Sequence, residues 1–147
     1  MQTAQAIEKL ESLCTAYCET AGRLEYNRRG LEGMFGLPGG PTKDPCHRQF
    51  REDAAALLRD FAAGGPDPAG IRALLSLLYE RPKQAAAPKT AYWTLIAVQG
   101  ETRELIPALR PEDAKALAAR FAALYPRRER LPVQDEILRL LQKAAKA

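Results

Sequence analysis

Apolar side chains recur at steps of three and four residues along the first part of the chain. The positions are Ile7, Leu10, Cys14, Tyr17, Ala21, Leu24 and, after a break at Arg28, Leu31. This spacing places them on one face of an α-helix, and charged residues such as Glu8, Lys9 and Glu11 fall on its other faces. The pattern predicts one long amphipathic helix from about Thr3 to about Arg29. Its apolar stripe must be covered by the rest of the chain or by a second copy in a homodimer.

The segment that follows is rich in residues that interrupt regular structure. Between Gly30 and Pro45 there are five glycines and three prolines. That density predicts a loop over residues 30–44 rather than a helix or strand. Met34, Phe35 and Leu37 are apolar residues within this predicted loop, so we expect them either to enter the core or to form a contact surface.

The remainder of the chain, residues 45–146, reads as pairs of shorter helices. Two of them begin with an aspartate that can cap a helix followed by a proline that suits its first turn, at Asp44–Pro45 and Asp67–Pro68. The helices expected from periodicity, caps and prolines cover about 45–63, 68–80, 90–100, 111–124 and 132–146. We expect the third of these ranges, Thr90 to Gly100, to be a central helix capped by Thr90, because its apolar residues fall all around it.

The composition favours the same fold class. Alanine and leucine account for 46 of the 147 residues, whereas valine, isoleucine and threonine together account for 14. Alanine and leucine suit helices, and β-branched residues suit strands. We therefore predict an all-α single domain over residues 1–147 with six to seven helices. It is either an irregular bundle or a short α-solenoid-like stack of antiparallel pairs, without a fixed repeat period.

The charge and the targeting signals of the chain indicate its cellular location and its possible partners. No export signal or membrane-spanning run is visible, so we expect a cytoplasmic protein without membrane contact. The formal net charge is +4, and residues 83–147 carry twelve basic and seven acidic groups. Nucleic-acid binding through this basic part is one functional alternative, with Arg127, Arg128 and Arg130 as its candidate phosphate contacts.

Three cysteines and the only histidine form the one constellation with metal-binding chemistry. Cys14 and Cys18 share a helix face, and Cys46 with His47 could complete a set of four ligands. In an antiparallel hairpin, however, Cys46 would lie near the end of the first helix, at about 15 Å from Cys18. Metal or small-ligand binding therefore stands as a second alternative. The odd number of cysteines fits a reducing compartment.

No convergent catalytic set, phosphate-binding loop or cofactor motif is recognisable in this sequence. We accordingly expect a non-enzymatic protein without a cofactor, which works by binding another protein or itself. The candidate contact residues lie at the end of the first helix and in the predicted loop after it: Tyr26, Arg28, Arg29, Met34, Phe35 and Leu37.

Overall fold

The computed structural model describes residues 2–35, 44–84 and 88–147, with the side chains of residues 27–35 left out. Within these ranges the chain forms α-helices, short 3-10 helices and no strand. The α-helices are α1 (Thr3–Phe35), α2 (Pro45–Ala63), α3 (Pro68–Glu80), α4 (Lys89–Gln99), α5 (Pro111–Leu124) and α6 (Pro132–Ala145). The 3-10 helices are η2 (Arg81–Lys83), η3 (Gly100–Thr102) and η4 (Ile106–Ala108). The predicted all-α fold is confirmed.

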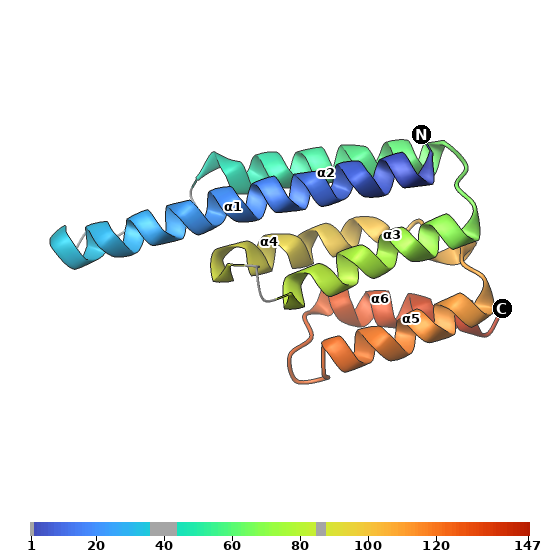
Figure 1. The fold of residues 1–147 in the computed structure, drawn as a ribbon. Helices are drawn as coiled ribbons and strands as arrows, with labels where there is room; N and C mark the ends of the chain where they lie inside the picture. The colour runs from blue at the N-terminus through green and yellow to red at the C-terminus, as the bar shows by residue number, and fades with distance from the viewer. Residues whose placement is uncertain (1, 36–43, 85–87) are drawn as a thin grey trace.

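The helices are arranged as three pairs stacked on one another (Figure 1). The α1–α2 pair lies at one end, the α3–α4 pair in the middle and the α5–α6 pair at the other end. Helices α1 and α2 pack on the middle pair, and α5 and α6 pack on it from the opposite side. The bundle is thus a short stack in which both faces of the middle pair are covered.

Local sequence signals set the starts of α2 and α3 as predicted. The Asp44 carboxylate accepts a hydrogen bond from the backbone N–H of Cys46 at 2.8 Å, and that of Asp67 accepts one from Gly70 at 3.0 Å. Gly70 also lets the start of α3 approach α1, because a Cβ atom there would collide with the side chain of Thr3. These contacts anchor the first turns of two helices.

Helix α1 is longer than the sequence pattern indicated. It continues to Phe35, so the placement of Met34 and Phe35 in a loop is wrong. Glycine in a helix costs only about 1 kcal/mol relative to alanine, whereas proline removes a hydrogen bond and clashes with the preceding turn. The first proline in this part of the chain is Pro38. As a result α1 extends past the ends of the other helices (Figure 1).

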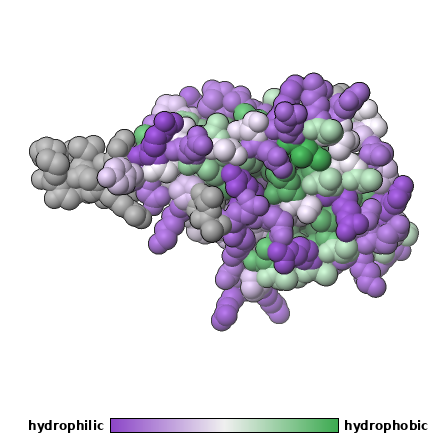
Figure 2. Space-filling view, in the orientation of Figure 1, coloured by the Kyte–Doolittle hydropathy of each residue, from purple (hydrophilic) through white to green (hydrophobic). Residues whose placement is uncertain are grey.

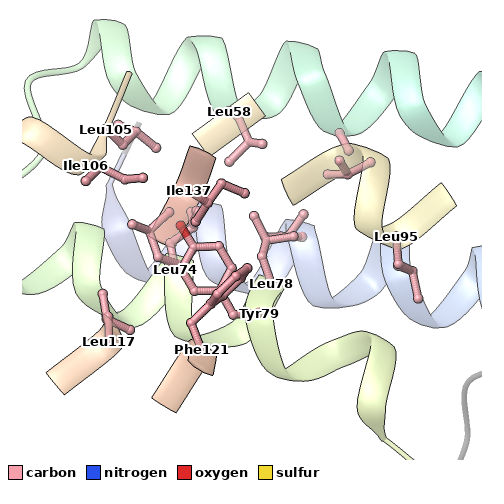
Figure 3. Packing of buried hydrophobic residues seen from close by; sticks show 14 of the residues in the cluster. Leu58, Leu74, Leu78, Tyr79, Leu95, Leu105, Ile106, Leu117, Phe121 and Ile137 are labelled. Atoms are coloured by element: carbon pink, nitrogen blue, oxygen red, sulfur yellow. The ribbon is translucent and has the colours of Figure 1, made fainter. Parts of the chain in front are cut away.

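All six α-helices contribute to one hydrophobic core. Figure 3 shows leucine, isoleucine and aromatic side chains from α2 to α6 converging in its centre. From α1, the side chains of Leu10, Cys14 and Ala21 are completely buried. The apolar stripe of α1 is therefore covered within the chain as far as Ala21, and a homodimer stays a prediction.

Helix α4 differs from its prediction at both its cap and its surface. Pro88 occupies the N-cap position, and Thr90 lies in the first turn. Leu95 and Val98 are buried as expected, but the side chain of Trp93 is 60% exposed. One side of α4 is therefore buried in the core, and the side that carries Trp93 is exposed to solvent.

A buried glutamine on α4 connects the helices around it. The Nε2 group of Gln99 donates to the hydroxyl of Tyr125 at 3.0 Å and to the carbonyl of Leu78 at 3.3 Å. Its Oε1 atom accepts from Nε2 of Gln134 at 3.2 Å. The Tyr125 hydroxyl donates in turn to the carbonyl of Tyr79 at 2.6 Å. Gln99 thereby joins α3, the C-terminal end of α5 and α6.

Thr102 extends this network into η3. Its hydroxyl donates to the carbonyl of Gln99 at 2.7 Å and lies 2.9 Å from the hydroxyl of Tyr79. Burial raises the pKa of Tyr79 and of Tyr125, so both keep their protons. Buried polar groups cost free energy unless they are hydrogen-bonded. The network therefore stabilises one relative orientation of these helices over alternatives that would leave its members unpaired.

The surface is mainly hydrophilic on the face shown in Figure 2. Apolar residues show there along the seams between α1 and α3 and between α3 and α5. Among the described residues, none of the helices combines the length and apolar character that crossing a bilayer requires.

We predict that Tyr125→Phe lowers the free energy of unfolding by about 1–3 kcal/mol, because it removes the hydroxyl that donates to the Tyr79 carbonyl and accepts one of the hydrogen bonds of the Gln99 amide. Urea unfolding measures this change. The matched control is Tyr26→Phe, since the side chain of Tyr26 is 79% exposed; its effect should stay within about 0.5 kcal/mol. Equal losses in the two variants would contradict the role of the network.

Candidate functional site

The start of α2 lies beside the middle of α1, not beside its end. The hydroxyl of Tyr17 and Nδ1 of His47 are 2.5 Å apart and form a buried hydrogen bond. The prediction that Cys46 lies near the end of the first helix is wrong, because its neighbour His47 lies beside Tyr17, about three helical turns before Arg28. The cysteine and histidine positions are therefore closer together than the sequence suggested.

Although these residues lie close together, they do not form the predicted metal site with four ligands. Within the described part of the chain, no group of three or more histidine, cysteine, aspartate or glutamate side chains is placed to hold one metal ion. Tyr17 occupies the space next to His47 with its own ring, which packs edge-on against the imidazole at a centroid distance of 5.5 Å. The side chains of Cys14, Cys18, Cys46 and His47 are thus not placed as a set of four ligands for one ion.

Tyr17 is instead a structural link between helices. Its ring stacks on that of Phe50 with centroids 4.3 Å apart and planes 6° apart. Burial raises the pKa of Tyr17 to about 12, and a hydrogen bond with Thr94 of α4 opposes this rise. Tyr17 thus holds α1, α2 and α4 together. The stripe pattern assigned it to the core, but no sequence signal indicated its pairing with His47.

The environment of the cysteines keeps all three as protonated thiols at neutral pH. Burial raises the pKa of Cys14 to about 11, against the opposing effect of the Arg81 guanidinium, and it also raises the pKa of Cys18. Burial and a hydrogen bond with the Asp44 carboxylate raise the pKa of Cys46 to about 11. A thiolate is the reactive form of cysteine, so these positions are unsuited to nucleophilic attack.

Two open hollows lie on α1. The first, of about 480 Å³, is lined by Cys18, Glu19, Gly22, Arg23 and Tyr26. A Cβ atom at Gly22 would meet nothing within 4 Å, so the surface beside this glycine is open.

The second hollow, of about 600 Å³, lies between α1 and α2. Its lining residues are Gln5, Glu8, Lys9, Ser12, Leu13, Ala16 and Leu57. Leu13 and Ala16 from α1 and Leu57 from α2 supply its apolar part. No pattern in the sequence indicates this hollow, because Leu13 and Ala16 lie off the main stripe and Leu57 comes from another helix.

The predicted contact residues at the end of α1 are only partly described. Tyr26 is strongly exposed and lines the first hollow. Arg28, Arg29, Met34 and Phe35 lie in the helical backbone of α1, and their side chains are outside the described part of the structure. Leu37 lies outside the described residues altogether. Contact through this region stays a prediction.

The predicted basic turn divides into one structural arginine and two exposed ones. Arg130 pairs with Asp135 at 2.8 Å and donates to the carbonyl of Tyr125 at 3.0 Å, and its side chain is only 13% exposed. It therefore closes the turn between α5 and α6, and its contact with phosphate stays a prediction. Arg127 and Arg128 are exposed, and phosphate binding by them stays a prediction.

Comparison of the chain with protein-family models, curated protein sequences and solved structures finds no match in any of the three.

We predict that the raised pKa of Cys14 makes stability decline in alkali. The unfolded thiol ionises near pH 9, whereas the folded one holds its proton to about pH 11. The stabilisation is thus complete below pH 9 and is lost as the pH rises toward 11. Cys14 contributes up to about 1.4 kcal/mol per pH unit in this range.

Urea unfolding of the reduced protein from about pH 8 to about pH 10.5 tests this prediction. The decline should be shallower in Cys14→Ala, whatever the absolute stability of that variant. An identical slope in the two proteins would show that Cys14 is not the titrating group.

Proposed function

We propose that this chain is a protein-interaction module that binds an amphipathic helix of another protein in the hollow between α1 and α2. The observation that carries the proposal is the hollow itself, about 600 Å³ in volume with Leu13, Ala16 and Leu57 among its lining residues. Grooves with an apolar floor between helices are a common way of holding a partner helix.

The position of the hollow in the stack supports this function. Ser12 and Ala16 follow the buried residues Leu10 and Cys14 by two positions, which is about 200° around the helix. Ser12 and Ala16 therefore lie on the side of α1 turned away from the core, whereas the lining residues Leu13 and Leu57 pack against the core. Helices α1 and α2 form an end layer of the stack, and the middle pair covers their inner side. A partner helix bound in the hollow would cover their outer side in the same way and so add one more layer to the stack.

The rim of the hollow indicates the chemistry of the partner. Gln5, Glu8, Lys9 and Ser12 are all exposed and offer both charges and neutral hydrogen-bonding groups. The small side chain of Ala16 permits close approach of a helix. A helix with two apolar residues at i and i+4 and a polar, mixed-charge flank fits this arrangement.

A cytoplasmic location accompanies the proposal. The three cysteines are free thiols, two of them buried, and a reducing compartment keeps them in that form.

We predict that Leu13→Asp weakens partner binding about tenfold or more, because it places a charge where an apolar anchor of the partner must sit. A photo-crosslinking amino acid is placed at Ser12, on the rim of the hollow. In cells of the organism from which the protein comes, it forms a covalent bond with whatever protein is bound there. The matched control is Leu140→Asp on α6, a half-buried leucine in the farthest layer of the stack.

The expected result is one defined crosslinked protein that is lost in Leu13→Asp and retained in Leu140→Asp, with both variants equally helical by circular dichroism. The proposal fails if no crosslink forms at Ser12 or if both variants retain it. A product of twice the chain mass would identify a second copy, which contradicts a separate partner.

A further inference from the structure

Cys14 and Cys18 form a pair of thiols on the opposite side of α1 from the hollow of the proposed function. They are one helical turn apart, and their side chains are 0% and 6% exposed. Arg81 of η2 lies next to both: it is within hydrogen-bonding reach of the Cys14 thiol, and its charge acts on each of the two sulfur atoms. Two soft ligands and one positive charge are thus gathered at a single place.

The spacing of the two thiols suits one shared metal ion. Residues four apart on a helix have Cβ atoms about 5–6 Å apart. Two sulfur atoms at bond lengths of about 2.3 Å from one ion are at most about 4.6 Å apart. Staggered side-chain rotamers bridge this difference without a change in the helix. No third ligand is needed by an ion that takes two ligands in a line.

Charge and softness select the ion. Thiolates favour Cu(I), and two thiolates on a monovalent ion leave one negative charge, which the Arg81 guanidinium balances. A divalent ion such as Zn²⁺ requires about four ligands, and the described residues offer no group of three. We propose that Cys14 and Cys18 bind one Cu(I) ion as a two-coordinate bis-thiolate, with Arg81 as its counter-charge.

The binding step is a proton exchange without a change in oxidation state. Both thiols lose their protons to the solvent, two Cu–S bonds form, and copper enters and stays as Cu(I). The ion is held at the edge of the core, because the Cys14 side chain is fully buried and that of Cys18 lines the open hollow.

A route to this pair exists on the surface. Cys18 lines the open hollow of about 480 Å³, together with Gly22 one turn further along α1. The absence of a side chain at Gly22 leaves the approach open, since a Cβ atom there would meet nothing within 4 Å. Copper can therefore reach the Cys18 thiol first and then Cys14 behind it.

Cys46 provides a control within the same chain. It lies in the first turn of α2, where its thiol hydrogen-bonds the Asp44 carboxylate. It is outside the proposed pair, so its replacement must leave copper binding intact.

Anaerobic titration of the full chain with Cu(I), against the chromophoric chelator bicinchoninate, tests the proposal. We expect one ion per chain, with an affinity unchanged in Cys46→Ser. Cys14→Ala and Cys18→Ala each remove a ligand, so each should lower the affinity for Cu(I) by more than roughly a hundredfold, which is the upper limit for removing a residue that contacts a ligand but not the metal. Arg81→Gln, which removes such a partner, should lose about 10- to 100-fold.

X-ray absorption on the copper-loaded wild-type protein gives a readout that does not depend on the folding of any variant. Two sulfur ligands and no nitrogen are the expected first shell. The proposal is overturned by a stoichiometry other than one, by loss of binding in Cys46→Ser, by a nitrogen ligand such as His47, or by tighter binding of Zn²⁺ than of Cu(I). These outcomes are independent of the helix-binding function, which uses the other side of α1.

Discussion

The hydrogen-bond network around Gln99 is the constraint on which the arrangement of the helices depends. Leucine and alanine side chains can pack in many registers at similar cost, because apolar contacts have little directionality. The buried amide of Gln99 is satisfied only when Tyr125 and Gln134 both face it. Since the Tyr125 hydroxyl also donates to the Tyr79 carbonyl, one orientation of α3, α4, α5 and α6 satisfies all of these groups together.

The end layer formed by α1 and α2 is joined to this framework by different means. Its inner side packs through the apolar stripe of α1, and Tyr17 adds contacts with His47 and Phe50. Its outer side is not covered within the described residues and includes the hollow at Leu13 and Leu57. The end layer therefore combines a packed inner face with an open outer face, which is the physical basis of the helix-binding proposal.

Helix α1 also carries the proposed copper site, because its two sides lie next to different parts of the structure. Cys14 and Cys18 face Arg81, which follows directly after α3, whereas Ser12 and Ala16 face outward. Burial keeps both thiols protonated in the free protein, whereas the Arg81 guanidinium beside them supplies the positive charge that a bis-thiolate site requires. The metal hypothesis drawn from the sequence combined the cysteines with His47, but in the structure His47 is hydrogen-bonded to Tyr17 and no group of three or more of these side chains is placed to hold one ion within the described residues.

Local signals in the sequence determined where most helices begin and end and which face of α1 is apolar. Asp44, Asp67 and the prolines act through their own backbone and nearest neighbours, so they can be read without a structure. The end of α1 was misjudged because glycine weakens a helix without ending it. The hollow, the Tyr17–His47 bond and the position of Arg81 next to Cys14 were decided by the tertiary structure alone. Each unites residues from different helices, and their distances depend on the packing of the whole stack, which no pattern along the chain encodes.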